Sequence, residues 1–179
     1  PLDPQEVRPR LERRLLEPSF GYGDFLFAAA DRLVESWKRH HDKRIPRFAD
    51  LSGAICAVEL HPETFRETRK VLQVRLEEAE LAREDAKALA EAWLHRWDFL
   101  LQPLEAGFDY VVGNPPYVRA DEGMEGLLEY REEIKNDHPI ESVGNLLEKR
   151  WDLFVPFVAL GVYLLRNETG RLGMITSNS

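Results

Sequence analysis

Four consecutive residues, Asn114-Pro115-Pro116-Tyr117, carry the most specific chemistry in this chain of 179 residues. An exocyclic amine such as adenine N6 is a poor nucleophile because its lone pair is delocalised into the ring. The Asn114 side-chain oxygen and the Pro115 main-chain carbonyl can each accept one of its two N–H groups. Pro116 restricts the preceding residue to extended geometry, so that carbonyl is aimed before a substrate arrives. Two preplaced acceptors favour the positive charge that develops on nitrogen during methyl transfer.

Tyr117 adds an aromatic face on which a planar base can stack. A base in a duplex is unreachable unless it is extruded, and stacking offsets part of the cost of unstacking it. The alternative is that Asn-Pro-Pro-Tyr is a tight turn after a strand, since proline pairs are common in loops. In either case the apolar run at residues 110–113 predicts a strand that ends at Asn114.

A glycine turn within residues 16–26 is the second candidate segment. Gly21 and Gly23 allow the backbone to approach a ligand at the start of a helical pattern, and free N–H groups at a helix amino terminus favour a carboxylate. The segment is not the dinucleotide fingerprint, because Phe25 and Leu26 stand where the third glycine belongs. A Gly-x-Gly turn alone is weak evidence for a ligand site.

Glu59 is an acid at the end of an apolar run, residues 54–58. A doubly wound sheet holds a nucleotide ribose at this position of its second strand. The gap from Gly23 to Glu59 exceeds the usual spacing of roughly 20 residues, and we assign the excess to a polar insertion at about residues 37–50. Its basic part, residues 38–44, either contacts phosphate or forms a solvated loop, and the solvated loop is favoured.

Asp98 and Phe99 form a further candidate pair, which follows a helical stretch rich in Glu, Ala and Leu. The acid could accept a hydrogen bond from a cofactor adenine, and the aromatic ring could stack on it. The alternative is an ordinary cap at the end of a strand. Without the other segments, the cap would be the better interpretation.

The elements that must position these residues alternate along the chain. We expect strands at residues 13–17, 54–59, 94–98, 109–113 and 171–177, and helices at 24–39, within 63–93 and at 151–166. This order predicts an α/β fold with a mainly parallel sheet and right-handed crossovers. The switch point falls between the first strand and the strand at 109–113, so Gly21, Glu59, Asp98 and Asn114 should converge at its carboxyl edge.

Taken in order, the segments resemble the S-adenosylmethionine-dependent N6-adenine DNA methyltransferases of restriction–modification systems, of the Asn-Pro-Pro-Tyr class found in fused type II enzymes. Residues 17–26 look like the first motif of that family, Asp-Pro-x-x-Gly-x-Gly-x-Phe-Leu, with Glu17 in place of the aspartate and Phe20 in place of a small residue or cysteine. The likeness covers most of the chain in patches, and residues 118–150 match least. These residues are expected near the substrate entrance as a mobile or partly helical segment.

The resemblance implies a Rossmann-like methyltransferase fold with S-adenosylmethionine as cofactor and no metal. The residues that it implies for cofactor binding are Glu17, Pro18, Gly21, Gly23, Phe25, Glu59, Asp98 and Phe99, and those for catalysis are Asn114, Pro115, Pro116 and Tyr117. The implied activity is methyl transfer to adenine N6 in DNA, as part of restriction–modification or phage defence. Two alternatives stay open: a methyltransferase acting on a protein glutamine or an RNA base, and a non-catalytic binding or scaffolding module of a multidomain defence protein.

Charge and composition limit the remaining possibilities. A net charge of −8 argues against unaided binding of double-stranded DNA, since phosphate contacts dominate duplex affinity. We therefore interpret residues 1–179 as the catalytic core of a longer protein whose DNA-recognition domain lies beyond Ser179. A single cysteine excludes a disulfide framework. Because no run of about 18 apolar residues exists, we expect a cytoplasmic protein without membrane contact.

Overall fold

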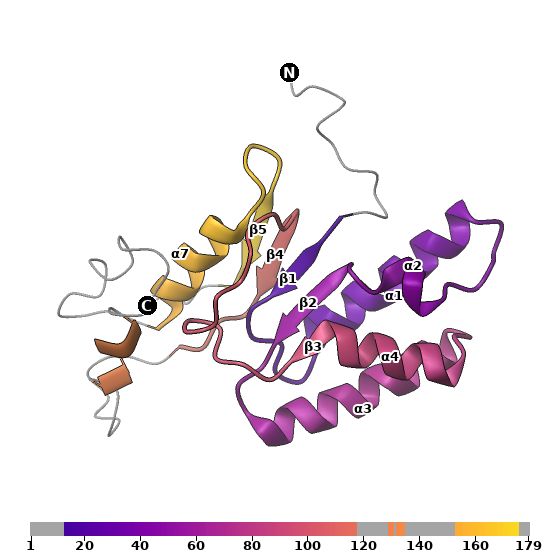
Figure 1. The fold of residues 1–179 in the computed structure, drawn as a ribbon, viewed down its shortest axis with the longest axis horizontal. Coiled ribbons are helices and arrows are strands. Elements are labelled where there is room, and N and C mark those ends of the chain that lie inside the picture. The colour runs from indigo at the N-terminus through magenta and orange to yellow at the C-terminus, as the bar shows by residue number, and fades with distance from the viewer. Residues whose placement is uncertain (1–12, 118–128, 131, 135–152, 176–179) are drawn as a thin grey trace.

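The computed structural model describes residues 13–117, 129, 130, 132–134 and 153–175. They form a five-stranded sheet in which every neighbouring pair is parallel, with strand order β3-β2-β1-β4-β5 (Figure 1). The strands are β1 (Leu15–Glu17), β2 (Ile55–Val58), β3 (Leu94–His95), β4 (Tyr110–Gly113) and β5 (Arg171–Met174). Since β1 pairs with both β2 and β4, the switch point expected beside the first strand is confirmed.

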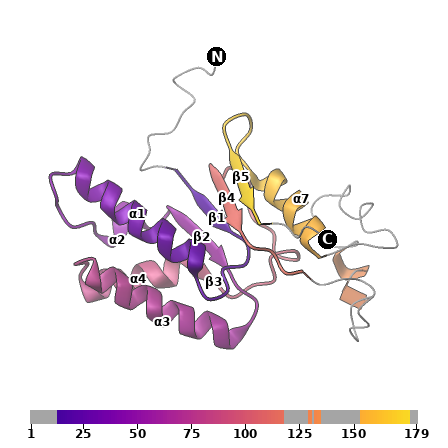
Figure 2. The same ribbon diagram turned by 180° about the vertical axis from the view of Figure 1, so that it is seen from behind.

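Helices α1 (Asp24–His40), α3 (Pro62–Glu78) and α4 (Arg83–Trp93) enclose one hydrophobic core with the side chains of β1 to β3, and the short helix α2 (Phe48–Leu51) adds to it. The apolar residues of α1 recur every three or four positions, which places Leu26, Ala30, Val34 and Trp37 on the side that faces this core. Figure 2 shows α1 and α3 in front of the strands from this side.

Helix α7 (Phe154–Leu164) covers the other face of the sheet, over β4 and β5. It approaches the strands closely at Gly161, where an added Cβ would lie 2.9 Å from Met174 Cε and 3.1 Å from Leu172 Cδ1. The core on this face also contains Phe99 and Phe157, whose ring centroids lie 5.1 Å apart. The loop that follows β3 is therefore packed against α7.

Several element boundaries differ from the expected ones. The strand expected at 94–98 ends at His95, because Asp98 begins a turn in which its main-chain oxygen accepts a hydrogen bond from Gln102 N at 3.0 Å. The polar insertion expected from residue 37 starts later, since α1 continues to His40 and Trp37 is buried in the core. The apolar stripe of α1 thus extends one turn further than the charge pattern suggested.

The first residues of the basic stretch, 38–40, belong to α1, whereas residues 42–44 are exposed in the loop that follows, in line with the solvated-loop interpretation. Lys38 Nζ donates to the Ala79 main-chain oxygen at 2.8 Å and pairs with Glu80 at 2.6 Å. The last turn of α1 is thereby tied to the end of α3. The strand expected at 171–177 begins at Arg171 as predicted. Its last residues, 176 and 177, lie outside the described residues, as do residues 151 and 152 of the helix expected at 151–166 and most of 118–150.

No described helix is long and apolar enough to cross a membrane. Within the described part of the chain, no three His, Cys, Asp or Glu side chains are grouped so that they could hold a metal ion.

Candidate active site

The glycine turn after β1 is fixed by the neighbouring elements rather than by its own sequence alone. Gly21 N donates to Glu59 Oε2 at 3.0 Å, and Thr68 Oγ1 on α3 donates to the Gly21 carbonyl at 2.8 Å. Gly21 and Gly23 have φ angles of 51° and 91°, in the left-handed region that favours glycine. A Cβ on Gly23 would also lie 2.6 Å from Phe27 Cζ. Both glycines are therefore required to begin α1 where it begins.

Glu59 lies beside this turn, as the sequence predicted, and it is only 5% exposed. Its two oxygens accept main-chain hydrogen bonds, Oε2 from Gly21 and Oε1 from His61 at 2.8 Å. The carboxylate thus links the glycine turn to the residue that precedes α3. Each oxygen has two lone pairs, so both can accept one further hydrogen bond.

Glu17 ends β1 and is 1% exposed, yet its Oε2 has no hydrogen-bond partner among the described residues. Burial, and then the charge of Asp24 in the first turn of α1, raise the pKa of Glu17 to about 8. A buried carboxyl with an unused oxygen is costly unless a donor reaches it. A cationic group bound at the start of α1 would supply such a donor, so the residues present fit a ligand that carries an ammonium group.

Asp98 lies in the loop after β3, and its two carboxylate oxygens use part of their capacity to accept hydrogen bonds. Oδ1 accepts from Leu100 N at 2.9 Å, and the Tyr130 hydroxyl lies 3.0 Å from Oδ1 and 2.9 Å from Oδ2. Phe99, the stacking residue predicted beside it, is 2% exposed and packs on Phe157. The ring is part of the core under α7 in this structure, and its stacking role stays a prediction.

The Asn114–Tyr117 motif begins where β4 ends, and Tyr117 folds back onto it. The Tyr117 hydroxyl lies 2.8 Å from Asn114 Oδ1 and 2.8 Å from the Ile175 main-chain oxygen just after β5. Asn114 is exposed and Tyr117 is 40% exposed, whereas Pro115 is buried. The motif is therefore anchored to two strand ends and still offers an amide and part of an aromatic ring at the surface.

The glycine turn and the Asn114 motif lie next to each other. One small crevice is lined by Pro18 and Ser19 on one side and by Asn114 and Pro115 on the other. At Gly113 an added Cβ would lie 3.4 Å from Pro18 Cδ. The neighbouring strands β1 and β4 thus bring Pro18 and the motif together, and Gly21 is hydrogen-bonded to Glu59. The convergence of all four predicted residues, Gly21, Glu59, Asp98 and Asn114, stays a prediction.

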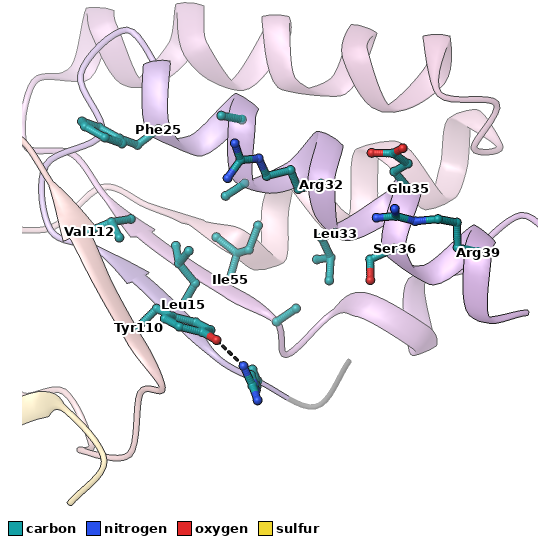
Figure 3. A pocket seen from close by; sticks show the side chains of 14 residues that line it. Leu15, Phe25, Arg32, Leu33, Glu35, Ser36, Arg39, Ile55, Tyr110 and Val112 are labelled. Atoms are coloured by element: carbon teal, nitrogen blue, oxygen red, sulfur yellow. Dashed lines mark hydrogen bonds between the residues drawn. The ribbon is translucent and has the colours of Figure 1, made fainter. Parts of the chain in front are cut away.

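Phe25 lies apart from the other residues predicted to bind the cofactor. Its side chain lines a cavity of about 580 Å³ beside α1, over the face of the sheet that carries Leu15, Ile55, Tyr110 and Val112 (Figure 3). None of the other predicted cofactor residues, all of which the structure describes, lines this cavity. Leu26, at the position of the third glycine, is buried in the core, and the Phe25 ring beside it lines this separate cavity.

Four residues at or near the site were not singled out from the sequence. Thr68 is an ordinary polar residue of an amphipathic helix, and Ile175 contributes only its main-chain oxygen. Nothing in the residue type of either one indicates a role in the site. Tyr130 stands in the poorly matched segment after the motif. Tyr22 could have been noticed, because an aromatic residue between two glycines has no core to join, and it is 74% exposed.

Comparison with known proteins places this geometry in context. The family model described as "Eco57I restriction-modification methylase" matches residues 32–179. The chain is 41% identical over 174 residues to the type II methyltransferase M.PaeR7I of Pseudomonas aeruginosa, and 36% identical over 174 residues to the type II methyltransferase M.XhoI of Xanthomonas vasicola. Each alignment covers 97% of this chain but only 28% and 30% of the relative, respectively. The chain thus spans less than a third of the length of these relatives.

Among solved structures, a Listeria monocytogenes protein assigned to the class I S-adenosylmethionine-dependent methyltransferases superposes with a TM-score of 0.50 at 12% identity. The superposition covers 93% of this chain and 39% of that one. The Rossmann-like methyltransferase fold implied by the motifs is therefore confirmed.

Proposed function

Because the chain belongs to the Eco57I restriction-modification methylase family, we propose that it is the cofactor-binding and catalytic part of an enzyme that transfers a methyl group from S-adenosylmethionine to adenine N6 in DNA. The observation that carries the proposal is the position of the Asn114 motif at the end of β4, against the glycine turn at the end of β1. A methyl donor held at the turn would face a base held by the motif.

The proposed cofactor contacts follow from the unused hydrogen-bonding capacity around the turn. S-adenosylmethionine supplies a methyl group activated by the positive charge on its sulfur. The free Oε2 of Glu17 would accept from an ammonium group, and the free N–H groups at the start of α1 would bind a carboxylate. Glu59 would accept from ribose hydroxyls and Asp98 from the adenine amine. Pro18, Gly21 and Gly23 shape the turn that holds these groups.

The proposed catalytic contacts centre on Asn114 and Pro115. Their two oxygens would hold the hydrogens of the target amine, so that the nitrogen lone pair turns out of the ring and toward the methyl donor. The Tyr117 hydroxyl has one proton and two acceptors within 2.8 Å. Donation to the Ile175 carbonyl leaves Asn114 Oδ1 available to the substrate, and the exposed part of the Tyr117 ring can stack on the extruded base.

No further group is needed to remove a proton, because the product ammonium can lose it to solvent. A covalent cysteine mechanism is disfavoured, since burial raises the pKa of the Cys56 thiol to about 11 and the thiolate is the reactive form. The proposed rate enhancement comes mainly from proximity and orientation.

Methyl transfer in the full-length protein tests the proposal. With tritiated S-adenosylmethionine and duplex DNA, we expect N6-methyladenine in the digested product and a loss of about 10²- to 10³-fold in rate for Asn114→Ala. Asn167→Ala, an exposed asparagine on the loop before β5, serves as the matched control and should keep its activity. Transfer that persists in the Asn114→Ala, Tyr117→Ala double variant contradicts the mechanism.

The alternative substrates are separated in the same experiment. A glutamine amide fits two oxygen acceptors as well as adenine N6 does, so label released by protease rather than nuclease would favour a protein substrate. A scaffolding role predicts no increase in the melting temperature of the full-length protein when S-adenosylmethionine is added.

A further inference from the structure

Tyr130 reaches the proposed adenine site from a part of the chain that follows the Asn114 motif. Its hydroxyl lies 3.0 Å and 2.9 Å from the two oxygens of Asp98, although the two residues are 32 positions apart. Residues 129, 130 and 132–134 have helical backbone, and Ile134, one helical turn after Tyr130, is 0% exposed in the core that contains Phe99 and Phe157. The hydroxyl is thus held against Asp98 by a buried anchor.

We propose that Tyr130 is a positioning residue that orients the Asp98 carboxylate to accept the exocyclic amine of the cofactor adenine. The inference deepens the proposed function and rests on it. It concerns which nucleoside the site prefers.

The direction of the hydrogen bond follows from the two groups. An ionised carboxylate is acceptor-only, so the phenol must donate. Burial, and then the negative charge of Asp98, raise the pKa of Tyr130 above its ordinary value, so the donor proton is retained at any working pH. A hydrogen bond to a charged acceptor is about twice as strong as a neutral one.

Asp98 can accept a hydrogen bond from the cofactor amine while Tyr130 is bound to it. The single proton of the Tyr130 hydroxyl is shared between Oδ1 and Oδ2. Oδ1 also accepts from Leu100 N, whereas Tyr130 is the only donor to Oδ2 among the described residues. Because each carboxylate oxygen has about two acceptor positions, Oδ2 retains one for an incoming amine. The Leu100 and Tyr130 contacts together fix the plane in which that position points.

The test compares two nucleosides in the full-length protein by calorimetry: S-adenosylhomocysteine and its 6-oxo counterpart, S-inosylhomocysteine. The second presents a carbonyl where the first presents an amine. We expect the wild type to prefer the adenosyl ligand and Tyr130→Phe to reduce that preference by about 3- to 10-fold, which corresponds to the loss of one hydrogen bond. Asp98→Asn should also reduce the preference, and adding Tyr130→Phe to Asp98→Asn should change it no further.

Glu129→Gln is the matched control, because it changes an exposed residue next to Tyr130 on the same helical segment and leaves the buried anchor in place. It should keep the wild-type affinity for both ligands and therefore their ratio. An unchanged ratio in Tyr130→Phe, an equal loss for both ligands, or an unchanged ratio in Asp98→Asn overturns the role of Tyr130 and leaves methyl transfer standing. Failure of the wild type to bind either ligand overturns the proposed function as well.

Discussion

At the scale of single residues, two acids near the glycine turn differ in how many hydrogen bonds their oxygens accept. Glu59 has both oxygens engaged by main-chain N–H groups, whereas Glu17 is buried with an unused oxygen. Burial without donors favours the neutral form of a carboxyl group, as at Glu17. Glu59 therefore acts as a fixed part of the turn, and Glu17 is the acid whose state is free to respond to a ligand.

The first prediction concerns Glu17 and pH. Its pKa is raised in the folded protein, so the stability that it contributes is complete below its ordinary pKa of 4.5 and is lost as pH rises through about 8. Between pH 6 and pH 9 the wild type should lose up to roughly 3 kcal/mol of unfolding free energy from this group. Glu17→Gln cannot ionise, so urea unfolding should show a much smaller difference between the two pH values.

Glu67→Gln on the exposed face of α3 is the control for Glu17→Gln and should keep the wild-type pH dependence. If Glu17→Gln and the wild type lose equal stability over this pH range, the carboxyl is not buried in its neutral form.

The second prediction separates the hydroxyl of Tyr117 from its ring. Tyr117→Phe removes the hydrogen bonds to Asn114 and the Ile175 carbonyl but keeps the stacking surface, whereas Tyr117→Ala removes both. In the full-length protein we expect single-turnover methyl transfer to fall by about 10-fold in the first variant and by 10²-fold or more, on the order of two hydrogen bonds and a stack, in the second. Equal losses would assign the whole effect to the hydroxyl.

At the scale of elements, α7 fixes the Asn114 motif from one side of the sheet. Phe157 packs on Phe99 in the loop after β3, and Phe154 lies 6.4 Å from the Tyr117 ring by centroids. Helix α7 therefore contacts the proposed adenine loop and the motif at the same time. Its distance from the sheet is set by Gly161, which lies against Met174 and Leu172.

The third prediction tests this packing. Gly161→Val would place methyl groups into space already filled by β4 and β5 side chains, so it should destabilise the fold by about 1–3 kcal/mol. Gly53→Val is the matched control, because nothing lies within 4 Å of a Cβ at Gly53. Urea unfolding measures both. Equal effects in the two variants would contradict a close approach of α7 to the sheet.

At the scale of the whole molecule, the basic stretch at residues 38–44 begins in the last turn of α1, whereas the proposed cofactor site lies at the first turn of that helix. Gly23 stands at the amino terminus of this 17-residue helix and Lys38 in its last turn. At 1.5 Å per residue the two ends are about 25 Å apart. The net charge of −8 also disfavours unaided binding of duplex DNA, since phosphate contacts dominate duplex affinity.

The fourth prediction follows from that separation. Reversing the charge of the exposed residues Lys43 and Arg44 to glutamate should change the affinity of the full-length protein for its target duplex by less than about 2-fold, since no phosphate contact is removed. Fluorescence anisotropy at a fixed salt concentration measures the change. A loss of tenfold or more, with a smaller salt dependence, would show that this loop contacts phosphate.

Local sequence determined most of the architecture. Apolar runs predicted the strands at 54–59 and 109–113, and the alternation of strand and helix signals placed the other three, because strand burial and turn chemistry are encoded within a few neighbouring residues. The spacing of Gly21, Gly23 and the Asn114 motif likewise predicted which strand ends meet. Boundaries were less certain, as Trp37 and Asp98 show, because core packing and side-chain turns decide where an element stops.

Tertiary structure decided how the site residues are used. Tyr117 is tied to Ile175, 58 positions away, Gly21 to Glu59 over 38 positions, and Asp98 to Tyr130 over 32. The same packing directs Phe25 into a separate cavity. Such contacts have no local signal, because they form only after parallel strands have brought distant turns to one edge of the sheet. The sequence predicted the chemistry proposed at that edge, and the folded chain determined which oxygens remain able to accept further hydrogen bonds.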